Sequence, residues 1–185
     1  MFSEEGTSLT ALYNRAEALR TRIETTADTT LVDEALALYD GVRSGISSLA
    51  VFSSNESLED VGNGALRLLL LDFRVAGVMM RRPFSRDAHG IERRISCLKK
   101  ARDSYLSFLD LADAYALISA PHRPLVESLR HDPARFSVGA GLSAEKARDA
   151  KIAAFRAERE LRREVEEGDD DDDDDDEGRG GCFRG

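Results

Sequence analysis

Apolar residues recur along this chain at intervals of three and four, the spacing that places them on one face of an α-helix. The first two such stripes lie in residues 8–25 and 30–49. They consist of Leu9, Leu12, Ala16, Leu19 and Ile23, followed by Leu31, Ala35, Leu38, Val42, Ile46 and Leu49. The TTADTT segment between them is rich in residues that favour caps and turns over helix interiors. The pattern predicts two antiparallel helices joined by a short turn, with Thr7 or Ser8 as the first cap.

Two longer helices are expected next. Residues 65–82 are apolar nearly all round, which places this helix at the centre of the fold, and Pro83 ends it. Residues 87–119 carry a long stripe that we expect to be buried, formed by Ile91, Ile95, Leu98, Ala101, Tyr105, Phe108, Ala112 and Tyr115. Between the second and third helices, Phe52 is expected to pack into the core. Ser53, Ser54 or Asn55 is expected to cap a short acidic turn there.

The rest of the chain is predicted to hold one helical turn at residues 125–130, inside an irregular connection, and a last helix from about Ser143. No strand-like alternation of useful length occurs. We therefore predict an all-α fold of antiparallel helix pairs in a tetratricopeptide-like array, although the tetratricopeptide consensus residues are not matched. Residues 1–167 are expected to form this domain, and residues 168–185 a disordered polyaspartate tail.

Charge is unevenly distributed along the chain. The formal net charge is -9, but eleven acidic residues and only two arginines follow Val165, so the preceding 24 acidic and 24 basic residues cancel. A balanced domain gives no reason to expect nucleic-acid or membrane binding, since both usually require a basic surplus. The N-terminal MFSEEGTSL lacks the basic and apolar regions of a signal peptide. We expect a cytoplasmic protein, with the nucleus open as a second location.

Residues with catalytic or ligand-binding chemistry are few and scattered. Cys97 and Cys182 make neither a disulfide framework nor a metal site, and Cys97 is expected to be a small core residue. The three histidines, at positions 89, 122 and 131, lie in or beside predicted loops without a helical partner. The glycines at positions 62 and 64 lack the context of a dinucleotide site. We expect no enzyme activity, cofactor or metal.

The last helix has one face that suggests a function. On a helical wheel of about 100° per residue, five of its side chains lie within one arc of about 80° and form a basic ribbon. These are Arg148, Lys151, Phe155, Arg159 and Arg162. A set of alanines with Leu161 and Val165 occupies another side, by which we expect the helix to dock. Residues 146–163 hold seven basic and three acidic residues, which we take to be the only strong local field of the domain.

Three blocks of sequence resemble the type 2A phosphatase-associated protein family, which includes the yeast Tap protein and mammalian alpha-four, or immunoglobulin-binding protein 1. They are LAVFSSNESLEDVGNGALRLLLLDF at 49–73, LKKARDSYLSFLDLADAYALI at 98–118 and RDAKIAAFRAERELR at 148–162. Their order matches that of the family, and with the intervening sequence the resemblance spans residues 31–163. The third block carries the family's run of a basic residue, Ala, Lys and Ile.

The resemblance implies a tetratricopeptide-like domain that binds the catalytic subunits of type 2A, 4 and 6 serine/threonine phosphatases. It also implies that such a protein holds them in a latent form, shields them from degradation and links them to target-of-rapamycin signalling, and is a monomer outside the complex. The family uses a basic pair of this helix against acidic surface on the phosphatase. The matching residues here are Arg148 and Lys151.

Other interpretations stay open at the level of sequence. The family continues after this helix with another long helix, which has no match here, so we expect either a divergent short member or a chain truncated at its C-terminus. Alternatively, the protein is a helical chaperone or scaffold whose tail, with eight successive aspartates at 169–176, binds basic proteins such as histones. The same tail could fold back on the chain's own basic helix.

Overall fold

The computed structural model describes residues 8–53, 57–137 and 143–171. The chain divides into two compact units, Met1–Arg130 and His131–Gly185, and each is described by itself. All regular elements in the described ranges are helices, and no strand occurs among them. The predicted all-α class is therefore confirmed. None of the described helices is both long and apolar enough to cross a membrane.

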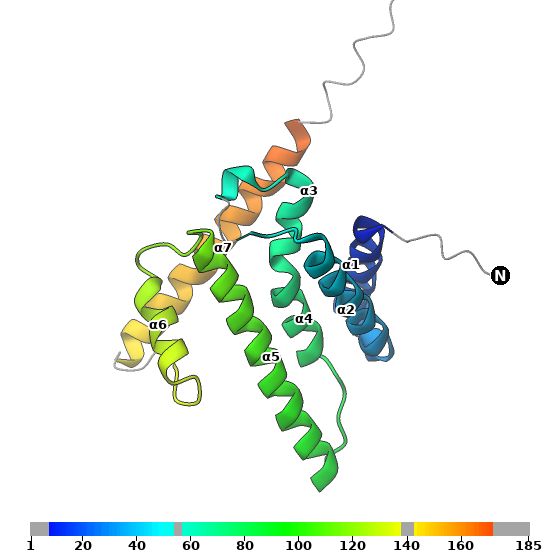
Figure 1. Cartoon of the computed structure of the whole chain (residues 1–185). Helices are drawn as coiled ribbons and strands as arrows, with labels where there is room; N and C mark the ends of the chain where they lie inside the picture. The colour runs from blue at the N-terminus through cyan, green and yellow to red at the C-terminus, as the bar shows by residue number, and fades with distance from the viewer. Residues whose placement is uncertain (1–7, 54–56, 138–142, 172–185) are drawn as a thin grey trace, which may run out of the picture. The chain divides into compact units, whose positions relative to one another are not determined.

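The first two helices form the predicted hairpin. α1 (Leu9–Thr26) begins where the Ser8 hydroxyl accepts a hydrogen bond from the backbone N–H of Ala11, as expected for its cap. Ala27 ends α1 in the left-handed conformation, and Asp28 then caps the short 3-10 helix η1 (Thr29–Leu31). α2 (Val32–Leu49) returns alongside α1 (Figure 1).

A short linking region precedes the central helix. η2 (Leu58–Asp60) is capped by Ser57, whose hydroxyl pairs with Asp60 while the Asp60 carboxylate accepts the Ser57 backbone N–H. The prediction that Ser53, Ser54 or Asn55 caps this turn is therefore wrong, because the cap falls at the residue directly before the helix. Ser54 and Asn55 themselves lie outside the described residues.

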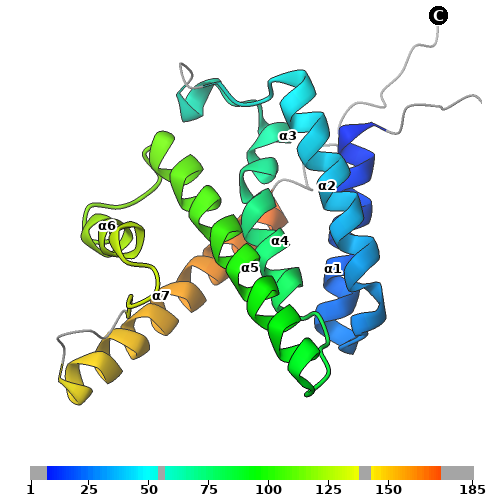
Figure 2. The same cartoon turned by 60° about the horizontal axis from the view of Figure 1, so that its bottom comes forward.

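The predicted central helix is present in three consecutive pieces, α3 (Asn63–Leu66), the 3-10 helix η3 (Arg67–Leu70) and α4 (Leu71–Met80). α5 (Ala88–Ala114) follows, capped by Asp87, and packs along α4 (Figures 1 and 2). α6 (Arg123–His131) corresponds to the predicted turn at 125–130.

In the second unit, α7 (Ala144–Asp171) starts where predicted and continues four residues into the predicted tail. The division at residue 167 stays a prediction.

The main core lies where the α1–α2 hairpin meets α4 (Figure 2). The largest fully buried side chains come from all three helices and are Ile23, Val32, Tyr39, Val42, Val75 and Val78. Burial of each such aliphatic side chain contributes about 1.5–3 kcal/mol to folding. Because α4 contacts α1 and α2 as well as α5, the prediction of a central, largely apolar helix is confirmed. Phe52 packs against the core as predicted, although it is half-buried and not fully buried, and its ring lies edge-on to Tyr115 with ring centroids 6.1 Å apart.

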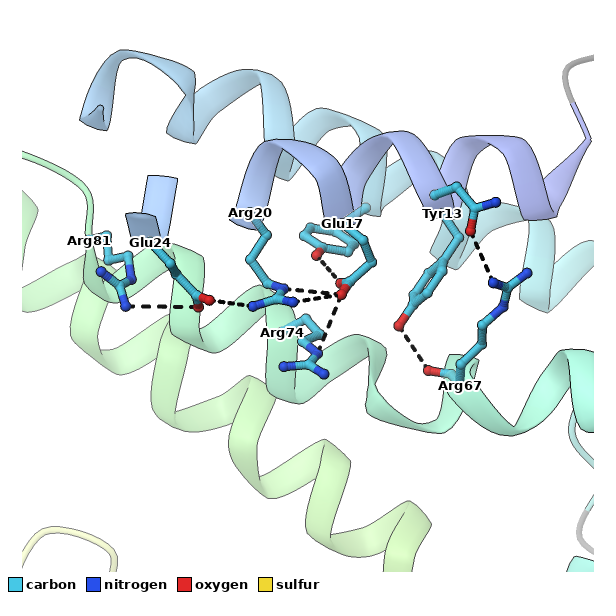
Figure 3. Close-up of polar contacts among 9 residues, drawn as sticks. Tyr13, Glu17, Arg20, Glu24, Arg67, Arg74 and Arg81 are labelled. Atoms are coloured by element: carbon cyan, nitrogen blue, oxygen red, sulfur yellow. Dashed lines mark hydrogen bonds and ion pairs between the residues drawn. The ribbon is translucent and has the colours of Figure 1, made fainter. Parts of the chain in front are cut away.

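A line of polar contacts joins the hairpin to α4, and Glu17 is at its centre (Figure 3). The hydroxyl of the buried Tyr39 donates to Glu17 Oε1 at 2.5 Å, Arg20 donates to Glu17 Oε2 at 2.9 Å, and Arg74 Nε lies 3.7 Å from the same carboxylate. The Tyr13 hydroxyl donates to the backbone oxygen of Arg67 at 3.0 Å. Burial raises the pKa of Tyr39, and the hydrogen bond to Glu17 raises it further.

One prediction about α5 is wrong. Ile91, Ile95 and Leu98, from the first half of its expected buried stripe, are 49%, 49% and 42% exposed. Only the following part of the stripe, from Ala101 onward, is buried or half-buried. The pattern identified an apolar face correctly, but periodicity does not say whether a neighbouring element covers it.

Candidate partner-binding surface

The candidate site from the sequence lies on α7. This helix begins where the hydroxyl of Ser143 accepts a hydrogen bond from the backbone N–H of Lys146 at 3.3 Å. Glu145 occupies the first turn, where a carboxylate interacts favourably with the positive end of the helix dipole. The helix then continues without a proline or glycine until Gly168, so the register of its side chains is fixed by helix geometry.

The structure places four of the five predicted site residues on one exposed stripe of α7. Arg148, Lys151, Phe155 and Arg159 are all exposed, and Phe155 shows 65% of its surface. Their spacing of three and then four residues brings them one above the other along the helix. The fifth, Arg162, lies in α7, but its side chain is outside the described residues. The arrangement offers three cations around one aromatic ring.

The sequence also predicts that α7 docks by a second face, which is rich in alanine, and the structure describes only part of that face. Ala154 and Ala157 are exposed, whereas the side chains of Ala147, Ala150, Leu161 and Val165 lie outside the described residues. The docking face therefore stays a prediction. One acidic residue of the helix is engaged locally, since Arg163 donates to Glu160 at 2.5 Å.

The groups that sequence analysis set aside as catalytic candidates are in ordinary surroundings. His89, His122 and His131 are exposed, and His122 Nδ1 lies 2.7 Å from the Ser119 hydroxyl oxygen. Cys97 is half-buried, and its thiol donates to the backbone oxygen of Met79 at 3.2 Å. Across the part of the chain that the structure describes, no three His, Cys, Asp or Glu side chains cluster as metal ligands.

The first unit exposes apolar surface beside α5. Two neighbouring hollows of about 630 and 420 Å³ share Phe108 and Leu109. The smaller one is also lined by Phe73, Met80 and Leu98, which are 41%, 46% and 42% exposed. This surface was not predictable from the sequence, because the apolar face of α5 has the same periodicity whether or not a neighbouring helix covers it.

The expectation that residues 146–163 form the only strong local field is wrong. Residues 81–102, which connect α4 to α5 and form the first half of α5, hold eight basic and only two acidic residues. That surplus of six exceeds the surplus of four on α7. The charges of this segment are visible in the sequence, but they alternate with the apolar stripe of α5, which is the stronger pattern there.

Comparison with solved structures places this arrangement of helices in a known class. A solved structure of the Tap42 alpha4 subunit matches 94% of this chain and 81% of its own length, with a TM-score of 0.69 and 21% sequence identity. At this level of identity the likeness shows the fold. The all-helical architecture is thus that of the Tap42 alpha4 subunit.

The family follows from the sequence comparisons. Residues 7–180 match the TAP42-like family, so the chain belongs to that family, and the resemblance seen in the three sequence blocks is confirmed. Type 2A phosphatase-associated protein 42 of Saccharomyces cerevisiae is 33% identical over 73 residues. That match covers 38% of this chain and spans only a fifth, 20%, of the yeast protein's length.

Proposed function

We propose that this chain is a non-catalytic adaptor that binds the catalytic subunits of type 2A-like serine/threonine phosphatases. Membership of the TAP42-like family, together with the name of its yeast relative, supports the class of partner. The binding surface that we propose is the exposed stripe on α7 formed by Arg148, Lys151, Phe155 and Arg159. Its exposure is the observation that supports this choice. Arg162 extends this stripe by the periodicity of the helix.

The mechanism is electrostatic docking. Arg148 and Lys151 lie one turn apart and can meet a single acidic patch, while Phe155 supplies apolar contact area between the cations. Complementary charge of this kind mainly accelerates encounter and sets orientation, and its effect weakens as salt rises. The chain thereby holds the type 2A, 4 or 6 catalytic subunit in a latent form within target-of-rapamycin signalling.

The helix pairs form a tetratricopeptide-like array over residues 1–167, the acidic residues beyond the end of α7 form a disordered tail, and the protein is a cytoplasmic monomer outside its complex. It uses no cofactor and catalyses no reaction itself. The antiparallel packing of α1 with α2 and of α4 with α5 supports the array.

The test is binding of the purified type 2A catalytic subunit to the full chain and to the double variant Arg148→Glu, Lys151→Asp. We expect binding to weaken by at least about tenfold, because reversing charges at a complementary interface converts attraction into repulsion. Exposed substitutions shift stability by only about 0.5 kcal/mol, so the fold should be intact by circular dichroism.

The matched control is Lys146→Asp with Arg156→Glu, which makes the same change of charge on the same helix. Both residues are exposed, and they lie at about 160° and 80° from Arg148 on the wheel. The control should bind within about threefold of the parent. If both double variants bind as the parent does, the basic stripe is a solvated face and the site assignment is wrong.

A second candidate function rests on the eight aspartates at 169–176, which favour a chaperone for basic proteins such as histones. Removal of residues 168–185 separates the two proposals. A chaperone of this kind would lose histone binding on removal of the tail and be insensitive to the α7 variant. The adaptor is expected to show the reverse with the phosphatase.

A further inference from the structure

The most basic segment of the chain, residues 81–102, is only partly neutralised. Three of its arginines are paired with carboxylates: Arg81 with Glu24 at 3.8 Å, Arg82 with Asp33 at 2.6 Å and Arg102 with Asp103 at 2.7 Å. None of the ion pairs among the described residues involves Arg93, Arg94 or Lys100. These three cations of the first unit therefore form no ion pair there, although Arg93 also interacts electrostatically with the Asp87 carboxylate.

These three cations line one groove, which we call the hairpin groove. It has a volume of about 950 Å³ and is walled by α2, the end of α4 with the connection after it, and α5. Arg93, Cys97 and Lys100 follow one another at steps of four and three along α5, so they share the face that looks into the groove. The groove belongs wholly to the first unit.

The side chains in the groove are held in place by the connection between α4 and α5. The Arg94 guanidinium lies over the Phe84 ring, 5.2 Å from its centroid, and donates to the backbone oxygen of Met80 at 2.9 Å. Arg93 donates to the Ser85 hydroxyl at 3.4 Å. Phe84 itself is 49% exposed. The groove thus presents oriented guanidinium groups beside an accessible aromatic ring.

The wall opposite α5 limits what can bind. α2 contributes Asp33 and Asp40 to the groove; Asp33 is paired with Arg82, which also lines it, and Asp40 is paired with Arg43 of the same helix. A continuous polyanion such as nucleic acid would have to pass these carboxylates, and a flat anionic bilayer cannot enter a concave groove. A protein segment with separate acidic and apolar side chains can place each kind where the groove favours it.

We propose that the hairpin groove binds an acidic peptide segment of a partner protein. Arg93, Arg94 and Lys100 bind its carboxylates, and Phe84 packs against one of its apolar side chains. All residues that line the groove belong to the first unit, and none belongs to α7. The groove is therefore an interaction surface in addition to the one proposed for the phosphatase, and variants of the two surfaces should act independently.

The experiment selects displayed random peptides for binding to the full chain. The peptides have about 12 residues, a length suited to a groove of this kind. We expect the selected peptides to be rich in Asp and Glu, with at least one aromatic or aliphatic residue. Their affinities are then measured by fluorescence anisotropy. Binding to Arg93→Glu, Lys100→Glu should be weaker by at least about tenfold, and Phe84→Ala should weaken it by about threefold or more.

The control variant is Arg86→Glu with Lys99→Glu, which changes the charge of the same segment equally at two exposed positions outside the groove. It should bind the peptides within about threefold of the parent. Selected peptides without an acidic excess would overturn the proposal, as would equal losses in both variants. So would a single-stranded DNA oligonucleotide that binds the parent as tightly as the peptides and is lost from Arg93→Glu, Lys100→Glu.

Discussion

Replacement of Tyr39 by Phe tests the polar contacts that join the hairpin to α4. Tyr39 is fully buried, and its hydroxyl donates to Glu17 at 2.5 Å. A hydrogen bond to a charged group contributes about 1.5–3 kcal/mol to stability. The ring stays in place, so no large cavity opens, and Glu17 keeps its bonds from Arg20 and part of its exposure to water. We therefore expect a loss near the lower end, about 1–2 kcal/mol.

The assay is urea unfolding followed by far-ultraviolet circular dichroism. With a slope of about 2 kcal/mol/M, the midpoint should fall by roughly 0.5–1 M while the slope itself is unchanged. Tyr105→Phe is the control. Among the described residues the hydroxyl of the half-buried Tyr105 hydrogen-bonds only with the Met80 sulfur, at 3.8 Å, so its loss should cost less than about 0.5 kcal/mol. Equal stability of Tyr39→Phe and the parent would show that the contact with Glu17 does not stabilise the fold.

Three further predictions concern the same unit. The free energy of unfolding should fall as the pH rises above about 10, because an unfolded tyrosine releases its proton near 10.0 whereas burial and Glu17 raise the pKa of folded Tyr39, so the folded state retains more protons. In urea titrations at a series of pH values, Tyr39→Phe should make this decline with pH less steep. A decline as steep as that of the parent would contradict the assignment to Tyr39. Gly90→Ala should cost about 1–3 kcal/mol, because its Cβ would lie 1.9 Å from the Ser85 backbone oxygen. Gly77→Ala should raise stability by about 0.4–1 kcal/mol, because Gly77 lies in α4 and an added Cβ would meet no atom within 4 Å. Equal shifts in melting temperature for the two glycine variants would show that Gly90 does not approach Ser85 as closely as described.

Several features of the fold were predictable because they are local. Ser8 and Asp87 accept backbone hydrogen bonds within their own first helical turn, so their positions in the sequence predicted where α1 and α5 begin. The stripe of Arg148, Lys151, Phe155 and Arg159 is likewise a property of one helix and its period. For that reason the sequence could place these residues on one face, although their partner stays a proposal.

Features that join distant segments were not predictable. Glu17 and Tyr39 lie 22 residues apart and meet only because α1 and α2 pack in one particular register. The cap at Ser57 was missed because several neighbouring serines can donate or accept in the same way, and the backbone path decides which one does.

Helix type, approximate helix ends and the basic stripe of α7 were determined by the sequence itself, since each depends on spacing within about one or two turns. Coverage was decided by tertiary structure: Ile91, Ile95 and Leu98 are apolar and in register, yet they are exposed. Net local charge also depends on packing, since Asp33 of α2 neutralises Arg82 but leaves Lys100 without a carboxylate among the described ion pairs. The physical reason is that burial and ion pairing are properties of two surfaces, and the sequence of one helix describes only its own.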